Sequence, residues 1–411
     1  MFGWLKGLNH QEKKALAAAF GGWSMDAFDF MVYTFLIPTL IAAWAMSESR
    51  AGLIVTCALL VSAIGGWAAG VLADRWGRVR VLQITIVWFA LFTFLSGFTN
   101  SFGQLLVTRS LQGLGLGGEW AVGSAMIGEI IRSQHRGKAV GTVQSGWAVG
   151  WGLAAILWIV FYTALPEDLA WRALFWVGVL PALLVFYVRR DVLEPEVSTA
   201  TRARMVEEGG SFLEIFSPAL LRTTVLASLM TTGMQGGYYA ITTWLPAYLK
   251  TERGLSVIDT GSYLVVVIAG SFVGYLVSAF LADYLGRRNT FFVFAVSSAC
   301  VAAFYAFIPI SNATMLVLGF PLGFFVSGNF SGVGAFLTEL YPSRVRGSGQ
   351  GFAYNFGRGI GALFPTLVGV MSTKMDLGTA IGVFAGIAYV LVIFAVSQLP
   401  ETRGKELAVY D

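Results

Sequence analysis

Two carboxylates lie in a stretch of this chain that is apolar enough to cross a membrane. The stretch 21–38, GGWSMDAFDFMVYTFLIP, contains Asp26 and Asp29. A carboxylate near the bilayer centre costs about 2.5–3.5 kcal/mol on insertion scales, so it is found mainly where it faces a bundle interior or a water-filled cavity. A spacing of three places both side chains on one helix face about 5–6 Å apart, where burial and mutual repulsion favour a protonated form of at least one. The pair therefore indicates a proton-carrying site; the alternative is a structural pair satisfied by neighbouring helices.

Other charged residues lie inside apolar segments. Arg358 is about twelve residues into its segment, or ~18 Å at 1.5 Å per residue, which places it near the midplane at a depth similar to that of Asp26. An arginine there stays charged and presents a planar fork that fits a carboxylate, so we expect Arg358 to bind a substrate anion. The alternative is a permanent ion pair with Asp26, Asp29 or Glu119. Glu119 is a second candidate proton carrier, or it neutralises Arg109 or Arg358.

Polar and aromatic side chains in several apolar segments could line a cavity around these charges. Aromatic faces suit the apolar part of an organic acid, and amides supply hydrogen bonds; each residue could equally serve helix packing. The candidates are Gln144, Trp147, Gln235, Tyr238, Tyr239, Asn329, Tyr354 and Asn355.

The composition is that of a membrane protein. The 411 residues are 56% hydrophobic and 12% charged, and a soluble protein would carry about twice that charged fraction. Apolar runs of about 20 residues recur along the chain, each long enough to span hydrocarbon. The first run follows a charged start without a small-residue cleavage site, which favours a retained helix over a signal peptide. We therefore expect an all-α polytopic membrane protein with twelve transmembrane helices, near 16–44, 51–73, 80–98, 102–130, 137–163, 171–189, 222–248, 257–281, 289–309, 313–340, 347–371 and 377–398.

Several kinds of chemistry are not expected. Cys57 and Cys300 lie in apolar segments and His10 and His135 in tails or loops, so the sequence suggests no disulfide, metal site or histidine proton relay. No nucleophile–base set occurs, and we expect neither an enzyme nor a bound cofactor. The basic residues are divided among loops, which argues against nucleic-acid binding.

The placement of basic residues predicts the topology. Of the 27 Lys and Arg residues, twenty fall in segments on the side of the N-terminus, five on the opposite side and two inside spans. Cytoplasmic loops carry such an excess. Both termini are therefore expected in the cytoplasm, in a plasma membrane of the bacterial inner-membrane type.

The chain contains an internal repeat. The segment Ala73–Arg78 is echoed by Ala282–Arg287 at an offset of 209, and Glu129 is echoed by Glu339 at an offset of 210. A long polar stretch divides the copies, which predicts a six-helix bundle at 1–190, a cytoplasmic loop at 191–217 and a six-helix bundle at 218–411. Two pseudo-symmetric, parallel repeats are a transporter architecture in which the substrate site lies between the halves.

The motifs resemble those of the major facilitator superfamily over essentially the whole chain. The stretch 70–78, GVLADRWGR, resembles its loop 2–3 signature, although Ala279 replaces the first glycine in the second copy. The stretch 109–115, RSLQGLG, resembles its fourth-helix motif; Trp171-Arg172 and the tail 400–405, PETRGK, resemble its sugar and metabolite porters. The stretch 26–29, DAFD, resembles the first helix of metabolite:proton symporters for carboxylates. Gly357-Arg358-Gly359 is more similar to the aromatic-acid group, whereas the length and the first helix fit the sialate and lactate group equally well.

The motif charges are expected to form gates at the cytoplasmic surface. Ion pairs at the inner end of the second span, and pairs of Glu129 with Arg132 or Arg136 and of Glu339 with Arg344 or Arg346, could hold the halves in one state and break when water enters. The alternative is a purely topology-setting cluster. The residues assigned to gating are Asp74, Arg75, Gly77, Arg78, Arg109, Glu129, Arg136, Asp283, Arg287, Glu339 and Arg346.

These features together predict a proton-coupled symporter that imports a small organic carboxylate, such as lactate, sialate or an aromatic acid, by alternating access. Its partners would be the organic anion, protons and the lipid bilayer, and we expect it to work as a monomer. A sugar or polyol porter, suggested by the tail, is one alternative. A drug exporter is another, although the fifth span lacks the Gly-Pro element of such antiporters. A third is a transporter-like receptor without turnover.

Overall fold

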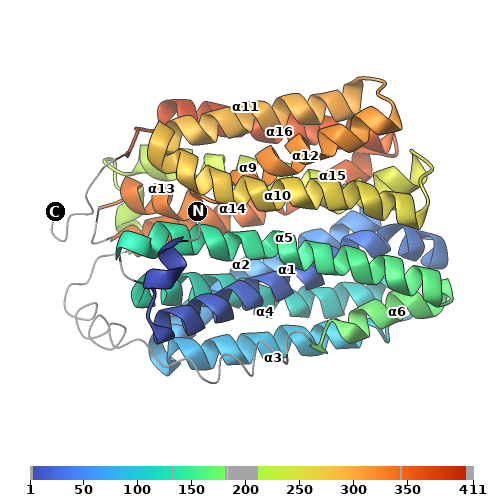
Figure 1. The fold of residues 1–411 in the computed structure, drawn as a ribbon, viewed down its shortest axis with the longest axis horizontal. Helices are drawn as coiled ribbons and strands as arrows, with labels where there is room; N and C mark the ends of the chain where they lie inside the picture. Colours follow the sequence, from blue (N-terminus) through green and yellow to red (C-terminus); the bar gives the residue numbers. More distant parts are fainter. Residues whose placement is uncertain (1–2, 132, 181–182, 184–211, 343–344, 404–411) are drawn as a thin grey trace.

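Every regular element that the structure describes is a helix (Figure 1). The computed structural model describes residues 3–131, 133–180, 183, 212–342 and 345–403. Within these ranges it leaves the side chains at 70–71, 74–75, 78, 120–126, 128–130, 133–137, 212 and 283 undescribed.

The first half of the chain forms six long helices after a short 3-10 helix, η1 (Gly3–Gly7). They are α1 (His10–Trp44), α2 (Glu48–Trp76), α3 (Arg78–Ser96), α4 (Phe102–Ile130), α5 (Ser133–Ala164) and α6 (Glu167–Val177). The helix α1 begins six residues before the span that the sequence predicts, because Asn9 and Glu12 form a reciprocal capping box that starts the helix outside the apolar run.

The second half follows a 3-10 helix, η2 (Phe212–Phe216), and forms six spans. They are α9 (Leu221–Thr251), α10 (Val257–Leu285), α11 (Arg287–Phe307), α12 (Asn312–Gly328) with α13 (Val333–Leu340), α14 (Arg346–Gly361) with α15 (Leu363–Met371), and α16 (Leu377–Gln398). Eight helices in the described ranges are long and apolar enough to cross a membrane by themselves. The twelve-helix prediction is confirmed, and the chain is a multi-pass membrane protein.

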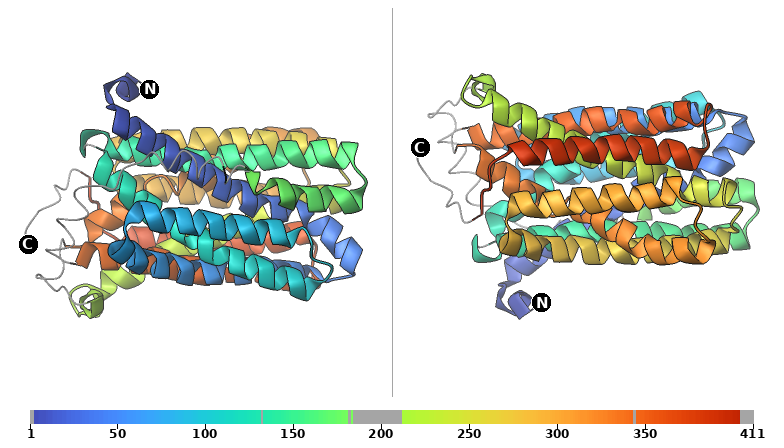
Figure 2. Two further views of the ribbon diagram at one scale, coloured as in Figure 1. Left: turned by 90° about the horizontal axis from the view of Figure 1, so that it is seen from below. Right: turned by 90° about the horizontal axis from the view of Figure 1, so that it is seen from above.

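The helices run along the long axis of the molecule as two bundles side by side, one blue to green and one yellow to red (Figures 1 and 2). Between the bundles α5 packs on α10, α2 on α14 and α15, and α1 on α9. The start of α1 and the end of α16 lie toward the same end, which we call the terminal end; the other is the distal end. The boundary expected at 191–217 falls mostly on residues 184–211, outside the described part, so those domain limits stay a prediction.

The two bundles repeat each other in backbone detail. Gly77 and Gly286, 209 residues apart, both have φ +96° at the junction between two helices. Gly113 packs on the carbonyl of Ala58, and Gly323 packs on that of Val267. The offsets of 209 and 210 therefore describe equivalent positions in space as well as in sequence.

Two spans that the sequence presents as continuous are broken. The tenth span leaves the helix between Gly328 and Val333, a run that includes two glycines and Asn329 and has low helix propensity. Backbone groups freed inside a membrane need partners within the protein. Gln144 of the other bundle donates to the Phe330 carbonyl at 3.2 Å, so the break is satisfied across the interface.

The eleventh span is interrupted at Ala362. Pro365 has no backbone N–H, so the carbonyl of Gly361 receives no hydrogen bond from it and the helix restarts as α15. The Ala362 carbonyl accepts a hydrogen bond from Thr56 of the first bundle, and Trp244 donates to the Pro365 carbonyl at 3.0 Å. The backbone carbonyls at this break again accept hydrogen bonds from side chains, one of them from the other bundle.

A test of this close packing is Gly117→Ala in α4. A Cβ at position 117 would overlap the Ser62 carbonyl oxygen of α2, a backbone atom that cannot move aside. We expect the variant to lose about 1–3 kcal/mol of stability, measured as a lower unfolding midpoint in detergent.

Gly386→Ala in α16 is the matched control, because no atom lies within 4 Å of a Cβ there. It should be neutral or slightly stabilising, by up to about 1 kcal/mol. Equal midpoints for the two variants would contradict the packing described here.

Candidate functional site

Asp29 is fully buried and held by three side chains. Arg109 Nη1 lies 3.1 and 3.2 Å from its two carboxylate oxygens, and Arg109 Nη2 donates to the Asp29 backbone carbonyl at 3.2 Å. Thr93 donates at 2.6 Å, and the Gln112 amide donates to the other oxygen. The Arg109 guanidinium also lies within 6 Å of the rings of Tyr33 and Phe175. The result is a buried, hydrogen-bonded ion pair inside the first bundle.

Asp26 has different neighbours although it precedes Asp29 by one helical turn. It too is fully buried, but its carboxylate interacts electrostatically with Arg358 of the other bundle. Three residues are about 60° short of a full turn, which is enough to turn Asp29 toward α4 and Asp26 toward α14. The sequence predicted that the two carboxylates form one pair, but in the structure they belong to separate sites.

Arg358 lies in α14 at the interface between the bundles and is 5% exposed. Its guanidinium lies 5.3 Å from the centre of the Tyr354 ring and beside the Tyr239 hydroxyl. Its Nε is a buried donor without a hydrogen-bond acceptor among the described residues. An arginine with an unsatisfied buried donor can bind an additional anionic oxygen.

Six aromatic rings, which we call the aromatic cluster, form a series of close pairs from both bundles that reaches Arg358 through Tyr239. Phe30 of α1 lies 5.9 Å from both Trp147 of α5 and Tyr239 of α9, measured between ring centres. Further pairs lie 4.8 to 6.5 Å apart. These separations are typical of interacting rings, which offer a flat apolar surface. The cluster consists of Trp23, Phe30, Trp147, Tyr238, Tyr239 and Phe330.

Three of these rings were not among the sequence candidates. Trp23 and Phe30 stand three residues before and four after Asp26, the spacing that places side chains on one helix face. That spacing could have identified them. Phe330 had no such signal, because it lies in the break between α12 and α13.

Polar contacts join the candidates to one another. The Trp147 indole of α5 donates to the Tyr238 hydroxyl of α9 at 2.5 Å, across the interface between the bundles. Gln235 donates to the Tyr354 carbonyl at 2.9 Å, and Tyr239 donates to Gln235 at 3.4 Å. The structure thus brings together Arg358 and most of the polar residues expected around it.

Two expected residues donate hydrogen bonds within their own bundle, and a third is buried in α4. Asn329 donates to Phe325 and Ser298 within the second bundle, at 3.0 and 3.4 Å. Asn355 donates to the Gly351 carbonyl of its own helix at 3.0 Å. Glu119 is buried in α4. The amide nitrogens of Asn329 and Asn355 therefore donate within their own bundle, whereas Asn355 Oδ1 lies beside Gly66 of the first bundle.

The motif charges that the structure describes pair within one bundle. Arg287 Nη2 lies 3.1 Å from Glu339 Oε1, and the other oxygen of Glu339 accepts a hydrogen bond from Thr402. Arg346 donates to the Thr338 carbonyl at 3.1 Å, and the ion pair of Glu339 that the structure describes is with Arg287. This pair holds the tail against the α10–α11 junction at Gly286. The side chains of Asp74, Arg75, Arg78, Glu129, Arg132, Arg136, Asp283 and Arg344 lie outside the described residues.

The bundles are tied together at the distal end. Thr56 of α2 hydrogen-bonds with Thr366 of α15 at 2.7 Å, and Ser372 donates to Glu48. Lys250 lies 3.8 Å from Glu167 across the interface. This end is closed.

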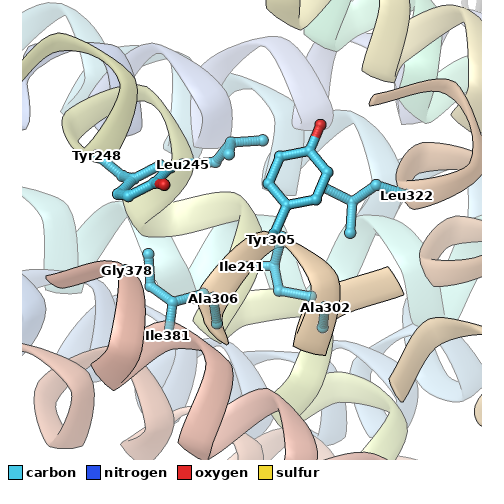
Figure 3. Close-up of a pocket in the computed structure, with 9 residues that line it drawn as sticks. All are labelled: Ile241, Leu245, Tyr248, Ala302, Tyr305, Ala306, Leu322, Gly378 and Ile381. Atoms are coloured by element: carbon cyan, nitrogen blue, oxygen red, sulfur yellow. The ribbon is translucent and has the colours of Figure 1, made fainter. Parts of the chain in front are cut away.

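A small cavity lies among α9, α11, α12 and α16 in the second bundle (Figure 3). Tyr305 and Leu322 face it, and the Tyr305 hydroxyl already donates a hydrogen bond to the Met315 carbonyl at 2.6 Å. With an apolar lining and a volume of about 20 Å³ it is not a candidate for binding an organic acid.

Comparisons with known proteins agree with this architecture. A family profile described as Major Facilitator Superfamily matches residues 18–365 and 270–408. A probable 4-methylmuconolactone transporter of Cupriavidus pinatubonensis is 43% identical over 407 residues, which are 98% of this chain and 94% of that protein. The cis,cis-muconate transport protein of Acinetobacter baylyi is 30% identical over 93% of this chain and 92% of its own length. The solved proton:xylose symporter XylE, bound to 6-bromo-6-deoxy-D-glucose, covers 96% of this chain and 97% of its own with a TM-score of 0.76 and 18% identity, which shows a shared fold.

The buried pair of Asp29 and Arg109 makes a stability prediction. Arg109→Met leaves Asp29 buried without its counter-charge, and we expect a loss of about 3–5 kcal/mol, seen as a lower unfolding midpoint in detergent. The double variant Asp29→Asn/Arg109→Met removes both charges and should recover part of that loss.

Lys374→Gln, an exposed charge at the distal end, is the control and should leave the midpoint unchanged. If the single and double variants unfold at the same midpoint, the ion pair does not carry the stabilisation assigned to it.

Proposed function

Since this chain belongs to the major facilitator superfamily, we propose that it is a proton-coupled symporter that imports a small organic carboxylate by alternating access. The observation that carries the proposal is Arg358: a buried arginine between the bundles, with an unsatisfied donor, beside Asp26 and the aromatic cluster. We propose no catalytic activity and no cofactor.

Coupling between proton and substrate would arise at Asp26. While Asp26 is ionised it competes with the substrate for Arg358; protonation removes that competitor and leaves the guanidinium for a substrate carboxylate. Only the protein loaded with both, or empty of both, then reorients at low cost, and this difference in stability between states couples the two fluxes.

Asp29 would be a second proton site with a different consequence. Its charge is balanced by Arg109 within the first bundle. Protonating Asp29 would weaken that ion pair and loosen α1 from α4. Because α1 carries Asp26 and Phe30 into the site, this would change the geometry around the substrate.

Reorientation requires the distal contacts to open. They consist of hydroxyl hydrogen bonds, close packing of Gly52 and Gly369, and an ion pair of partly exposed residues, Lys250 and Glu167. Such contacts cost little to break when water can reach them. The two bundles could then rock about the central site while their own packing is preserved.

The substrate class is supported by the site and by the named relatives. The aromatic cluster suits an acid with a flat apolar part, and two relatives are named for muconolactone and muconate. Lactate, sialate and aromatic acids remain the candidates. The sugar alternative rested on the tail motif. Glu401 and Thr402 of that tail hydrogen-bond to Arg287 and Glu339, which gives the motif a structural role without a sugar.

We further propose that the protein works as a monomer in a bacterial-type inner membrane with both termini in the cytoplasm. The excess of basic residues on the terminal side supports this orientation. The distal end, which is closed here, would then face outward.

Proton coupling can be tested with Asp26→Asn and Asp29→Asn in proteoliposomes. Under an inward proton gradient, with a panel of lactate, sialate, benzoate, nicotinate, muconate and a hexose, we expect each variant to lose at least about tenfold in accumulation, because a neutral amide cannot carry the proton. Substrate counterflow without a gradient should persist. Asp168→Asn is the control, because this carboxylate is exposed at the distal end. Full gradient-driven accumulation by Asp26→Asn would refute its role.

Arg358 can be tested separately as the anion-binding group. Arg358→Gln should raise KM for the carboxylate by about 10- to 100-fold, in line with the roughly 1.5–3 kcal/mol of a hydrogen bond to a charged group. Arg358→Lys should fall between, because an ammonium keeps the charge but loses the planar fork. Unchanged KM in both variants, or transport of the hexose without competition by carboxylates, would favour the sugar porter.

A further inference from the structure

An apolar groove opens on the lipid-facing side of the first bundle, between α2, α3 and α4. Its volume is about 210 Å³. Glycine and alanine residues contribute to its lining, and larger apolar side chains of the lining, such as Trp76 and Ile84, are exposed. The groove lies toward the terminal end. Its lining residues are Gly65, Ala68, Ala69, Leu72, Trp76, Val81, Ile84, Thr85, Trp88, Leu114 and Gly115.

Two polar side chains within the groove, those of Thr85 and Trp88, already have hydrogen-bond partners. The Thr85 hydroxyl donates to the Leu82 carbonyl at 2.9 Å, and the Trp88 indole donates to the Leu111 carbonyl at 2.8 Å. Among the described lining residues, only the exposed Trp76 indole at the end of the groove is left as a free side-chain donor, so the lining favours hydrocarbon as the occupant.

The internal repeat shows what a filled groove looks like. At the offsets of 209 and 210, Thr85 corresponds to Phe294, and Leu114 and Gly115 correspond to Phe324 and Phe325. In the second bundle Phe294 lies 5.5 Å from both of the other rings, measured between ring centres. The backbone contacts match, since Gly65 packs on Leu114 as Gly274 packs on Phe324. The second bundle fills with its own side chains the space that the first leaves open.

A basic residue, Arg80, lies near the mouth of the groove, and the equivalent position in the second bundle is not basic. Arg80 is exposed and precedes Ile84 and Trp88 by one and two turns, which places it on the same face of α3 at the membrane surface. Trp76, 55% exposed, ends the groove on α2. The position that corresponds to Arg80 is Asn289, whose amide donates to the Leu285 carbonyl of its own bundle at 3.0 Å.

We propose that this groove binds one anionic phospholipid from the leaflet at the terminal end. An acyl chain lies in the groove against Ala68 and Leu114, and the phosphate lies at Arg80. The complementary charge at the mouth selects the lipid, since a basic residue at the membrane surface attracts anionic headgroups.

The test measures lipid retained by the purified full-length protein in native mass spectrometry. Dioleoylphosphatidylglycerol and dioleoylphosphatidylcholine are added in turn. We expect one phosphatidylglycerol per chain and weaker retention of phosphatidylcholine. Ala68→Leu, which fills part of the groove, and Arg80→Gln, which removes the charge, should each lower the retained phosphatidylglycerol about fivefold.

Ala68→Ser keeps a small side chain at position 68, and Arg288→Gln removes a charge from the same membrane surface in the second bundle; both should retain lipid as the natural chain does. Size-exclusion profiles confirm that each variant is folded. Full retention by Ala68→Leu would overturn the groove as the binding site. Equal retention of the two lipids, or equal loss from Arg80→Gln and Arg288→Gln, would overturn the role of Arg80.

Discussion

A bilayer offers no water to a charge, so each buried charge in this protein depends on partners that the fold supplies. Asp29 has Arg109, Thr93 and Gln112 in its own bundle. Asp26 has Arg358 in the other bundle. The first arrangement is closed within one rigid body, whereas the second spans the surface along which the bundles would have to move. That difference makes Asp26 and Arg358 the centre of the proposed mechanism.

The same constraint explains the two broken helices. Unwinding exposes backbone carbonyls, and here side chains of the first bundle bind them: Gln144 binds that of Phe330, and Thr56 binds that of Ala362. The breaks therefore lie where the bundles meet, with one near the aromatic cluster and the other toward the distal end. Hydrogen bonds of this kind are specific enough to align the bundles and few enough to be exchanged when they move.

The repeat has diverged where function would require it. The first bundle holds the buried acids of α1, while α9, which opens the second bundle, contains no Asp or Glu from Leu221 to Thr251. Arg358, the buried arginine at the interface, belongs to the second bundle. The lipid-facing sides differ as well. Phenylalanine rings fill the space in the second bundle, whereas the equivalent space in the first bundle is an open groove near Arg80. Equivalent backbones thus carry different chemistry.

The sequence by itself determined the twelve spans, the repeat at 209 residues and the depth of Asp26 and Arg358, because apolar length, motif spacing and rise per residue are local properties. Only the tertiary structure decided which charges meet. A rotation of about 60° separates Asp26 from Asp29, and Glu339 pairs with Arg287, 52 residues away in the chain. Phe330 and the open groove depend on helices distant in sequence. Partners and cavities are set by packing between helices, which no spacing along one helix encodes.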